Sequence, residues 1–285
     1  MPNDTAGIDP SRPSIARIYD YLLGGTENYA VDREIGDFFL EELPGSVAVP
    51  IENRRALIRA VAAMTHDGIR QFIDMGSGLP TADNVHQVAQ RHRPDARVVY
   101  VDNDPTVLAH GRALLAADER TAVIRADVRE PESIHQHPDV ARLIDFDQPV
   151  GIIFSAVLHH LNDAEQPGEL VHWWTDRVPP DSRIYISHFR TGDGDGDGDG
   201  DGDGDGDNEQ TRIAEQKLQD AFGRGRWRTD EEITALFGDL ELLEPGLVNC
   251  SLWRPESAPA PNTGTPPHEP TVWERMISCA LARKP

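Results

Sequence analysis

The sequence Phe72-Ile73-Asp74-Met75-Gly76-Ser77-Gly78-Leu79-Pro80 predicts a strand that runs into a glycine-rich turn. Its apolar beginning is typical of a buried strand, which should end near Asp74. Gly76 and Gly78 allow the backbone to turn tightly and to approach a ligand without an intervening Cβ atom. If a helix follows from Thr81, its N-terminal N–H groups and the positive end of its dipole lie beside the turn. Strand, turn and helix in this order bind nucleotide-like ligands in doubly wound α/β folds.

Composition limits the possible classes of protein. The 285 residues are 38% hydrophobic, which suits a globular chain, and no apolar run is long enough for a membrane span. The two cysteines, Cys250 and Cys279, are too few for a disulfide framework, and the first residues lack a secretory signal pattern. We therefore expect a cytoplasmic protein. The net charge of −22 argues against nucleic acid or an anionic membrane as the main partner.

Strand patterns alternate with helix patterns through the middle of the chain. Five apolar runs are predicted as strands, at residues 71–74, 97–101, 122–125, 150–154 and 183–187. Strands separated by helices imply a parallel sheet with right-handed crossovers. Two later strands, at 240–244 and 276–282, would form an antiparallel pair at the end of this sheet. The prediction is an α/β, Rossmann-like fold with a mostly parallel seven-stranded sheet and an antiparallel last strand.

The remaining segments are predicted as additions to this sheet. Residues 1–65 contain three helical patterns and no strand signal, so they should form an N-terminal helical extension that caps the Rossmann-like core of residues 66–285. No second core is evident, so we expect a single domain. The Asp-Gly repeat at 192–207 is predicted as a flexible insert and the Pro-rich segment 255–270 as an irregular loop. In no register does the repeat supply the final glutamate of an EF-hand loop, so calcium binding is not expected.

The glycine-rich turn does not fit the best-known nucleotide motifs. Thr81 stands where a dinucleotide fingerprint needs its third glycine, and no Gly-Lys-[Ser/Thr] sequence follows as a P-loop would require. Polar residues nevertheless end the five predicted parallel strands: Asp74, Asp102, Asp127, Ser155 and His188. These ends line the binding crevice of an open α/β sheet. A carboxylate at the end of the second strand can accept hydrogen bonds from both hydroxyl groups of a ribose.

Four short motifs, Asp74-Met-Gly-Ser-Gly-Leu-Pro80, Val101-Asp-Asn-Asp-Pro105, Ala126-Asp127 and Ala156-Val-Leu-His159, resemble those of class I S-adenosylmethionine-dependent methyltransferases. More narrowly, the chain resembles an actinobacterial S-adenosyl methyltransferase family of mostly unassigned substrate. The family's N-terminal signature is similar to Arg12-Pro-Ser-Ile-Ala-Arg-Ile-Tyr-Asp-Tyr-Leu-Leu-Gly-Gly25, followed by Asn28 and Asp32-Arg-Glu34. The Asp-Gly repeat and the tail Trp273–Cys279 depart from the family pattern, and neither belongs to the expected cofactor site.

The resemblance implies S-adenosyl-L-methionine as cofactor and assigns roles by position. The methionine end would contact Asp74, Gly76, Ser77 and Gly78. Asp102 would bind the ribose hydroxyls, Asn103 and Val128 would lie beside the adenine ring, and Asp127 would face the adenine amino group. Ser155 and Ala156 would lie under the cofactor.

Methyl transfer requires alignment of the acceptor and, for a protonated acceptor, a base. His159 and His160 follow the fourth strand, where an acceptor would meet the methyl group. Either could be this base, or both could be structural histidines of a cap region; His188 is a weaker candidate. A metal site from His159, His160 and Asp163 is not expected, since neighbouring side chains of a helix point about 100° apart.

The helical extension offers a second group of candidates. Tyr21 and Gly24 could belong to a lid over the cofactor, because an aromatic face favours a sulfonium and a double glycine could act as a hinge. Tyr19 is better explained as a core residue of the first helix. Arg17, Asn53 and Arg54 could contact a carboxylate, but solvated helix faces are the simpler expectation.

These features favour an S-adenosylmethionine-dependent methyltransferase that acts on a small molecule. Two alternatives stay open at the level of sequence. One is a non-catalytic protein that binds S-adenosylmethionine or its demethylated product, since no residue is clearly indispensable for chemistry. The other is an NAD-linked oxidoreductase with an atypical glycine loop.

Overall fold

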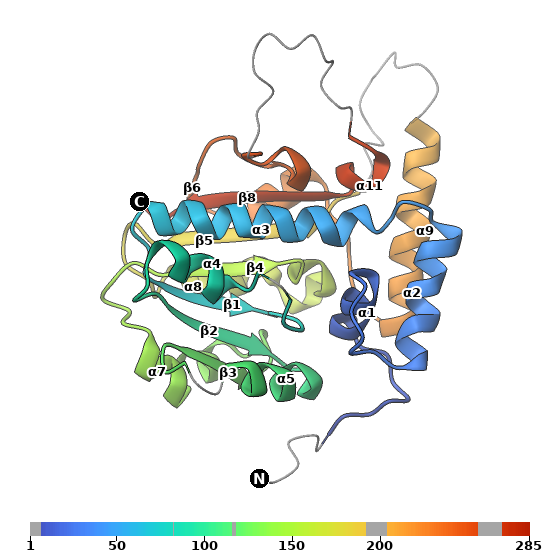
Figure 1. The fold of residues 1–285 in the computed structure, drawn as a ribbon. Coiled ribbons are helices and arrows are strands. Elements are labelled where there is room, and N and C mark those ends of the chain that lie inside the picture. Colours follow the sequence, from blue (N-terminus) through green and yellow to red (C-terminus); the bar gives the residue numbers. More distant parts are fainter. Residues whose placement is uncertain (1–6, 82, 116–117, 192–203, 256–269) are drawn as a thin grey trace.

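The fold is built on one eight-stranded sheet, seen in the computed structural model, which describes residues 7–81, 83–115, 118–191, 204–255 and 270–285 (Figure 1). The strand order is β3-β2-β1-β4-β5-β8-β6, with β7 also pairing with β8. The strands are β1 (Gln71–Met75), β2 (Arg97–Asp102), β3 (Thr121–Arg125), β4 (Gly151–Ser155), β5 (Arg183–Phe189), β6 (Glu241–Leu242), β7 (Val248–Asn249) and β8 (Ile277–Arg283). The first five are parallel and β8 runs antiparallel to β5, as the sequence predicts.

The predicted count of seven strands is wrong by one, and the difference lies at the edge of the sheet. β8 has seven residues, whereas β6 and β7 have two each. β6 pairs with the end of β8 at Arg283 and Ala282, and β7 pairs with its beginning at Cys279 and Ser278. Two short strands therefore share one edge, and two residues are too few to produce a strand pattern in a sequence.

Helices cover both faces of the sheet. They are α1 (Ile15–Leu22), α2 (Ala30–Glu42), α3 (Ala48–His66), α4 (Val85–His92), α5 (Pro105–Leu115), α6 (Pro131–His135), α7 (Pro138–Leu143), α8 (Pro167–Thr175), α9 (Gly204–Phe222), α10 (Asp230–Ala235) and α11 (Val272–Arg275). Helices α3, α4 and α5 contribute to one buried cluster, and α6, α7 and α8 to the other, together with Leu236 and Phe237 just after α10. Alternate residues of β2 divide between the two, with Val98 and Tyr100 in the first and Val99 and Val101 in the second. None of the described helices is both long and apolar enough to cross a bilayer.

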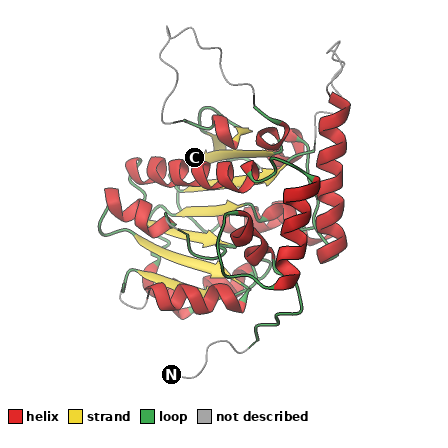
Figure 2. Cartoon of the chain, turned by 45° about the vertical axis from the view of Figure 1, so that its right-hand side comes forward, coloured by secondary structure: helices red, strands yellow, loops and turns green. Residues whose placement is uncertain are grey.

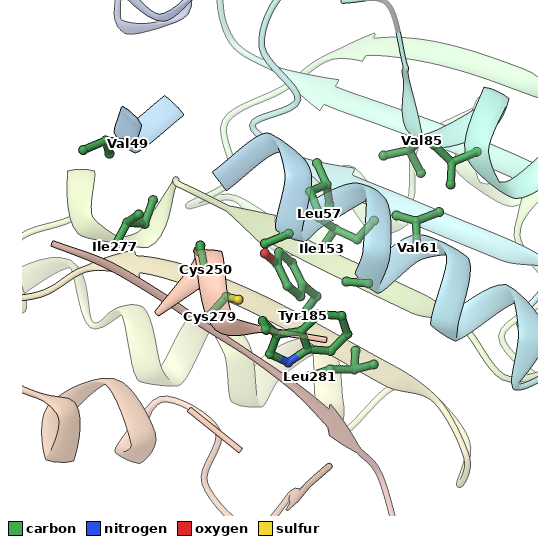
Figure 3. Packing of buried hydrophobic residues seen from close by; sticks show 14 of the residues in the cluster. Val49, Leu57, Val61, Val85, Ile153, Tyr185, Cys250, Ile277, Cys279 and Leu281 are labelled. Atoms are coloured by element: carbon green, nitrogen blue, oxygen red, sulfur yellow. The ribbon is translucent and has the colours of Figure 1, made fainter. Parts of the chain in front are cut away.

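The first cluster explains the position of α3, which lies across the sheet over β5 and β8 (Figure 1). Its Leu57 and Val61 face Tyr185 of β5 and Leu281 of β8 in the packed core (Figure 3). Cys250 and Cys279 are free and buried beside them. Helix α3 therefore packs as a layer of the Rossmann-like core, although its residues belong to the segment predicted as an extension.

The other N-terminal helices stand at the carboxyl ends of the parallel strands. Figures 1 and 2 both show α1, α2 and α9 side by side there. Helices α2 and α9 make contact where Lys217 Nζ lies 4.4 Å from the ring centre of Phe38. Helix α9 begins at Gly204, so the last four residues of the Asp-Gly repeat, 204–207, belong to a helix that the sequence analysis did not predict there. Residues 192–203 of the repeat and residues 256–269 of the Pro-rich loop lie outside the described residues.

Candidate functional site

A cavity of about 540 Å³ lies at the carboxyl ends of the parallel strands, between the sheet and α1. It brings together eleven residues that the sequence singles out: Asp74, Gly76, Ser77, Gly78, Asp102, Asn103, Asp127, Val128, Ser155, Ala156 and His160. These residues come from the ends of four different strands, as expected for the binding crevice of an open α/β sheet. His159, Tyr21 and Gly24 do not line this cavity.

The glycine loop after β1 is fixed to the end of β2. Gly76 and Gly78 have φ angles of 70° and 65°, which L-residues with a side chain rarely adopt. The N–H groups of Gly76 and Ser77 both donate to the carbonyl oxygen of Val101, at 2.7 and 3.1 Å. Gly78 N–H donates to Asp102 Oδ2 at 2.9 Å. These three hydrogen bonds hold the loop against the end of β2.

Two buried carboxylates face the floor of the cavity. Burial raises the pKa of Asp74 to about 7, an effect that the nearby guanidinium group of Arg54 opposes. Burial also raises the pKa of Asp102 to about 6, although the N–H groups of Asp104 and Gly78 stabilise its charge. A cationic or hydroxyl-bearing ligand would compensate the desolvation of both groups, since both line the cavity.

Asp127 lines the cavity, but its carboxylate is engaged by a cation. Arg129 donates from Nε to Oδ1 at 2.9 Å and from Nη2 to Oδ2 at 2.5 Å. This pair holds the pKa of Asp127 below its usual value. Arg129 and Arg224 also share Glu165 Oε1, each at 2.7 Å. The ionised carboxylate of Asp127 can only accept hydrogen bonds. It can therefore bind an amino group only through a lone pair that Arg129 leaves accessible.

A buried hydrogen-bond network supports the residues after β4. Asn53 Nδ2 donates to Tyr19 Oη at 3.0 Å and to Ser155 Oγ at 3.2 Å, and Ser187 Oγ donates to Asn53 Oδ1 at 2.6 Å. Ser187 Oγ also accepts from the N–H of Ala156, whose φ angle is 55°. Asn53 is 3% exposed, so the solvated helix face expected for it is wrong. Its neighbours come from α1, β4 and β5, which a pattern local to one helix does not reveal.

Arg17 is likewise buried, and the solvated face expected for it is also wrong. It lies 3% exposed between two carboxylates. Nε donates to Asp32 Oδ2 at 2.7 Å, and Nη1 lies 3.6 Å from Asp104 Oδ2. Ser14 links the same two carboxylates, because its N–H donates to Asp32 and its hydroxyl to Asp104. The N-terminal signature thus docks α1 and α2 on the loop that follows β2.

Arg54 is half-buried at the cavity wall, where Nη2 donates to the carbonyl oxygen of Asp83 at 2.6 Å. Its charge lowers the pKa of Asp74 and so favours the ionised carboxylate. Arg54 therefore does not lie on a fully solvated helix face, and its contact with a carboxylate stays a prediction.

The two residues expected in a lid lie elsewhere. Tyr21 donates its hydroxyl to Asp37 of α2, and its ring covers Gly36, where an added Cβ would come within 2.3 Å of Tyr21 Cδ1. Gly24 ends α1 away from the cavity wall. Tyr19 lines the cavity instead and donates to the carbonyl oxygen of Pro50 at 2.9 Å. Tyr19, which the sequence favoured as a core residue, is therefore the tyrosine of α1 that lines the cavity, together with Ile15, Ala16 and Arg17 of the same helix.

The three candidate histidines have different surroundings. His160 is half-buried at the cavity wall, and burial lowers its pKa to about 4, so the ring is neutral near pH 7. His159 is 1% exposed and stacks on Phe189, and its Nδ1 accepts the Phe189 N–H at 3.2 Å. His188 is held by Arg228 at 2.9 Å and by a carbonyl oxygen. Only His160 reaches the cavity.

Asp163, considered for a metal with the histidines, accepts instead from Arg228 at 2.9 Å. Within the described ranges, no three histidine, cysteine or acidic side chains gather in a way that could hold a metal ion.

Comparison with known proteins gives a consistent assignment. The model of the S-adenosyl methyltransferase family matches residues 2–285. A solved structure from Thermobifida fusca, provisionally assigned as a methyltransferase, is 41% identical, with a TM-score of 0.85 over 98% of this chain and 97% of its own. A DUF574 family protein from Streptomyces avermitilis is 32% identical, with a TM-score of 0.85 over 97% of this chain and 99% of its own.

More distant structures share the fold alone. An O-methyltransferase family protein from Burkholderia thailandensis is 12% identical, with a TM-score of 0.51 over 87% of this chain and 62% of its own. Among curated proteins, no sequence matches this chain. The family match spans nearly the whole chain and agrees with the cavity at the strand ends. The chain belongs to the S-adenosyl methyltransferase family, and the protein is an S-adenosylmethionine-dependent methyltransferase.

Proposed function

We propose that the cavity at the strand ends binds S-adenosylmethionine with its methionine end at Asp74 and the glycine loop and its ribose at Asp102. The observation that supports this most is the convergence of two buried carboxylates and a hydrogen-bonded glycine loop on one cavity. Its volume of about 540 Å³ lies within the range of small-molecule sites. Asp74, with a pKa near 7, would gain a partner from the ammonium group of the ligand.

The adenine end would lie between Asn103, Val128 and Asp127. Asn103 is exposed at the cavity rim, and Val128 offers an apolar side chain against a ring. Asp127 would accept from the adenine amino group while keeping its pair with Arg129. Ser155 and Ala156 would lie under the cofactor, where Asn53 and Ser187 hold them in place.

The bound cofactor supplies an electrophilic methyl group on a sulfonium. The chain must hold an acceptor in line with that group and exclude water. His160 is the neutral ring at the cavity wall, so it would accept the proton that the acceptor releases. We infer that the acceptor is a small molecule, because the site is a cavity of about 540 Å³ beside α1.

Calorimetric titration with S-adenosylmethionine, S-adenosylhomocysteine and NAD tests this proposal. We expect the first two to bind and NAD not to bind. Transfer of a labelled methyl group to a metabolite extract then tests catalysis, with heat-treated protein as control. Binding of neither S-adenosyl compound would contradict the proposed site. We further expect a cytoplasmic location, with which the two free thiols are consistent, and no nucleic-acid partner, given the net charge of −22.

A further inference from the structure

A second cavity, of about 80 Å³, adjoins the cofactor cavity on the side of α1 and α9. The two share five wall residues: Ile15, Tyr19, Ala156, His160 and Phe222. The rest of the second wall is mainly apolar and includes Ile18, Leu22, Val49, Leu218 and Trp227. We call this space the inner pocket. His160 is therefore one of the residues at the boundary of the two cavities.

The inner pocket contains an unused hydrogen-bond donor. His159 lines it, and the ring is 1% exposed. Because Nδ1 accepts the Phe189 N–H at 3.2 Å, the proton of the neutral ring sits on Nε2. Nε2 is buried and has no hydrogen-bond partner among the described residues. A buried N–H without a partner is unfavourable, so a ligand oxygen at this place would satisfy it. This tautomer also means that His159 acts as a donor and not as the base considered for it.

The charge of the pocket restricts what can enter. No aspartate, glutamate, lysine or arginine is among the described residues that line it. Transfer of a carboxylate or an ammonium group into such a wall would be costly, since nothing there pairs with it. An uncharged apolar group is favoured by the surrounding aliphatic and aromatic side chains. The small volume fits one ring-sized group.

Resting on the proposed function, we infer that the methyl acceptor is a neutral, hydroxylated molecule whose ring-sized apolar part occupies the inner pocket and presents an oxygen to His159 Nε2–H. Its reacting hydroxyl group lies at the junction with the cofactor cavity. In the transfer, the methyl carbon–sulfur bond breaks and its electron pair stays on sulfur, while a carbon–oxygen bond forms. The hydroxyl proton passes to His160 and then to solvent.

The inference can be tested by binding alone, with the full-length protein saturated with S-adenosylhomocysteine. Four probes each contain one benzene ring and differ in net charge and in whether they carry an oxygen atom: phenol, toluene, benzoate and benzylammonium. We expect ligand-observed NMR titration to give phenol the tightest binding, with benzoate and benzylammonium weaker by about tenfold or more. Equal or tighter binding of either ion would overturn the inference.

Two variants test the hydrogen-bond donor of His159 and the apolar space of the inner pocket separately. His159→Phe keeps an aromatic ring against Phe189 but removes the N–H group. The affinity for phenol should therefore fall about fivefold, while the affinity for toluene should not change. Leu218→Trp should fill the pocket and abolish binding of both. His135→Phe is the matched control, because His135 also stacks on aromatic rings but lies at neither cavity. Unchanged phenol binding in His159→Phe would overturn the role of the donor.

Calorimetry with S-adenosylhomocysteine on every variant distinguishes this inference from the proposed cofactor site. If the unmodified protein fails to bind S-adenosylhomocysteine, the proposed function falls. If it binds that compound but binds the four probes with equal affinity, the inner-pocket inference is wrong and the proposed cofactor site is not affected.

Discussion

Arg17 and Asp32 form an ion pair that is buried on both sides. Nε lies 2.7 Å from Oδ2, and the two side chains are 4% and 0% exposed. Asp32 also accepts the N–H groups of Ser14 and Tyr29, so its carboxylate is fully engaged at the start of α2. Because Arg17 also approaches Asp104, the pair links two helices of the N-terminal segment to the wall of the cofactor cavity.

Arg17→Ala should therefore destabilise the protein strongly. It would leave the buried Asp32 charge without its cation, a change that typically costs about 3–5 kcal/mol. Urea unfolding followed by circular dichroism measures the loss. Arg70→Ala is the matched control, since Arg70 pairs with Asp95 at 3.0 Å while both side chains are 59% exposed, and such surface pairs contribute about 0–1 kcal/mol. Equal losses in the two variants would contradict the structural role of the buried pair.

Asp102→Ala should weaken the binding of S-adenosylhomocysteine by about 2 kcal/mol or more, the scale of losing charge-assisted hydrogen bonds. Part of the loss would come from the glycine loop, because Asp102 also holds the Gly78 N–H. Calorimetric titration measures the effect. Asp95→Ala is the control, since Asp95 is exposed in the turn before β2 and pairs only with Arg70 among the described residues. Unchanged affinity in Asp102→Ala would remove the ribose assignment.

The raised pKa of Asp74 predicts a pH dependence of cofactor affinity. Below its pKa of about 7 the free protein holds Asp74 neutral, and the cationic amino end of the ligand favours the ionised form. Affinity should therefore rise as the pH increases towards 7. It should fall again above about pH 8, where an α-amino group loses its own proton.

Titrations of S-adenosylmethionine from pH 5.5 to 8.5 can detect this profile. Asp74→Asn should bind more weakly at pH 7 and lose the dependence between pH 6 and 7, apart from the smaller contribution of Asp102, whose pKa is about 6. A rise of the same size in Asp74→Asn would show that another group is responsible.

His160→Gln should lower the rate of methyl transfer and leave cofactor affinity nearly unchanged. The loss of a positioned base typically reduces the rate by about 10²–10⁴-fold. Single-turnover transfer of a labelled methyl group measures the rate once an acceptor is known, and calorimetry measures affinity. His135→Gln serves as control because His135 does not line the cavity. A rate within threefold of the unmodified protein would exclude His160 as the base.

The sequence predicted the features that depend on local pattern. The parallel direction of the first five strands, the antiparallel β8 and the meeting of Asp74, Asp102 and Asp127 at one cavity all follow from apolar runs and strand ends. The sequence did not predict the burial of residues whose environment depends on contacts far along the chain. Arg17 and Asn53 read as polar helix residues, and only partners far along the chain, such as Asp104 and Ser187, bury them.

The histidine pair shows the same limit. His159 and His160 are adjacent in sequence and look equivalent, yet the fold buries one against Phe189 and leaves the other at the cavity wall. Which of two neighbouring residues faces a site depends on backbone direction in the short turn after β4, and that direction follows from contacts with β5.

Gly76 and Gly78 offer a comparison at nearly equal φ angles of 70° and 65°. A Cβ atom at Gly76 would lie 2.0 Å from Val157 Cγ2, whereas one at Gly78 would meet nothing within 4 Å. Both alanine substitutions therefore carry the backbone cost of about 1–3 kcal/mol for a side chain in this region. Gly76→Ala carries in addition the displacement of Val157, so it should lower the free energy of unfolding more than Gly78→Ala.

The double variant Gly76→Ala/Val157→Ala isolates the steric part of this difference. Removal of the Val157 methyl groups makes room for the new Cβ, so the double variant should lose less stability than the two single losses added together. Only the backbone cost and the small cavity at Val157 would remain. Urea unfolding of the four proteins gives the coupling energy. If the losses are simply additive, contact with Val157 does not explain why glycine is needed at residue 76, and backbone conformation alone accounts for it.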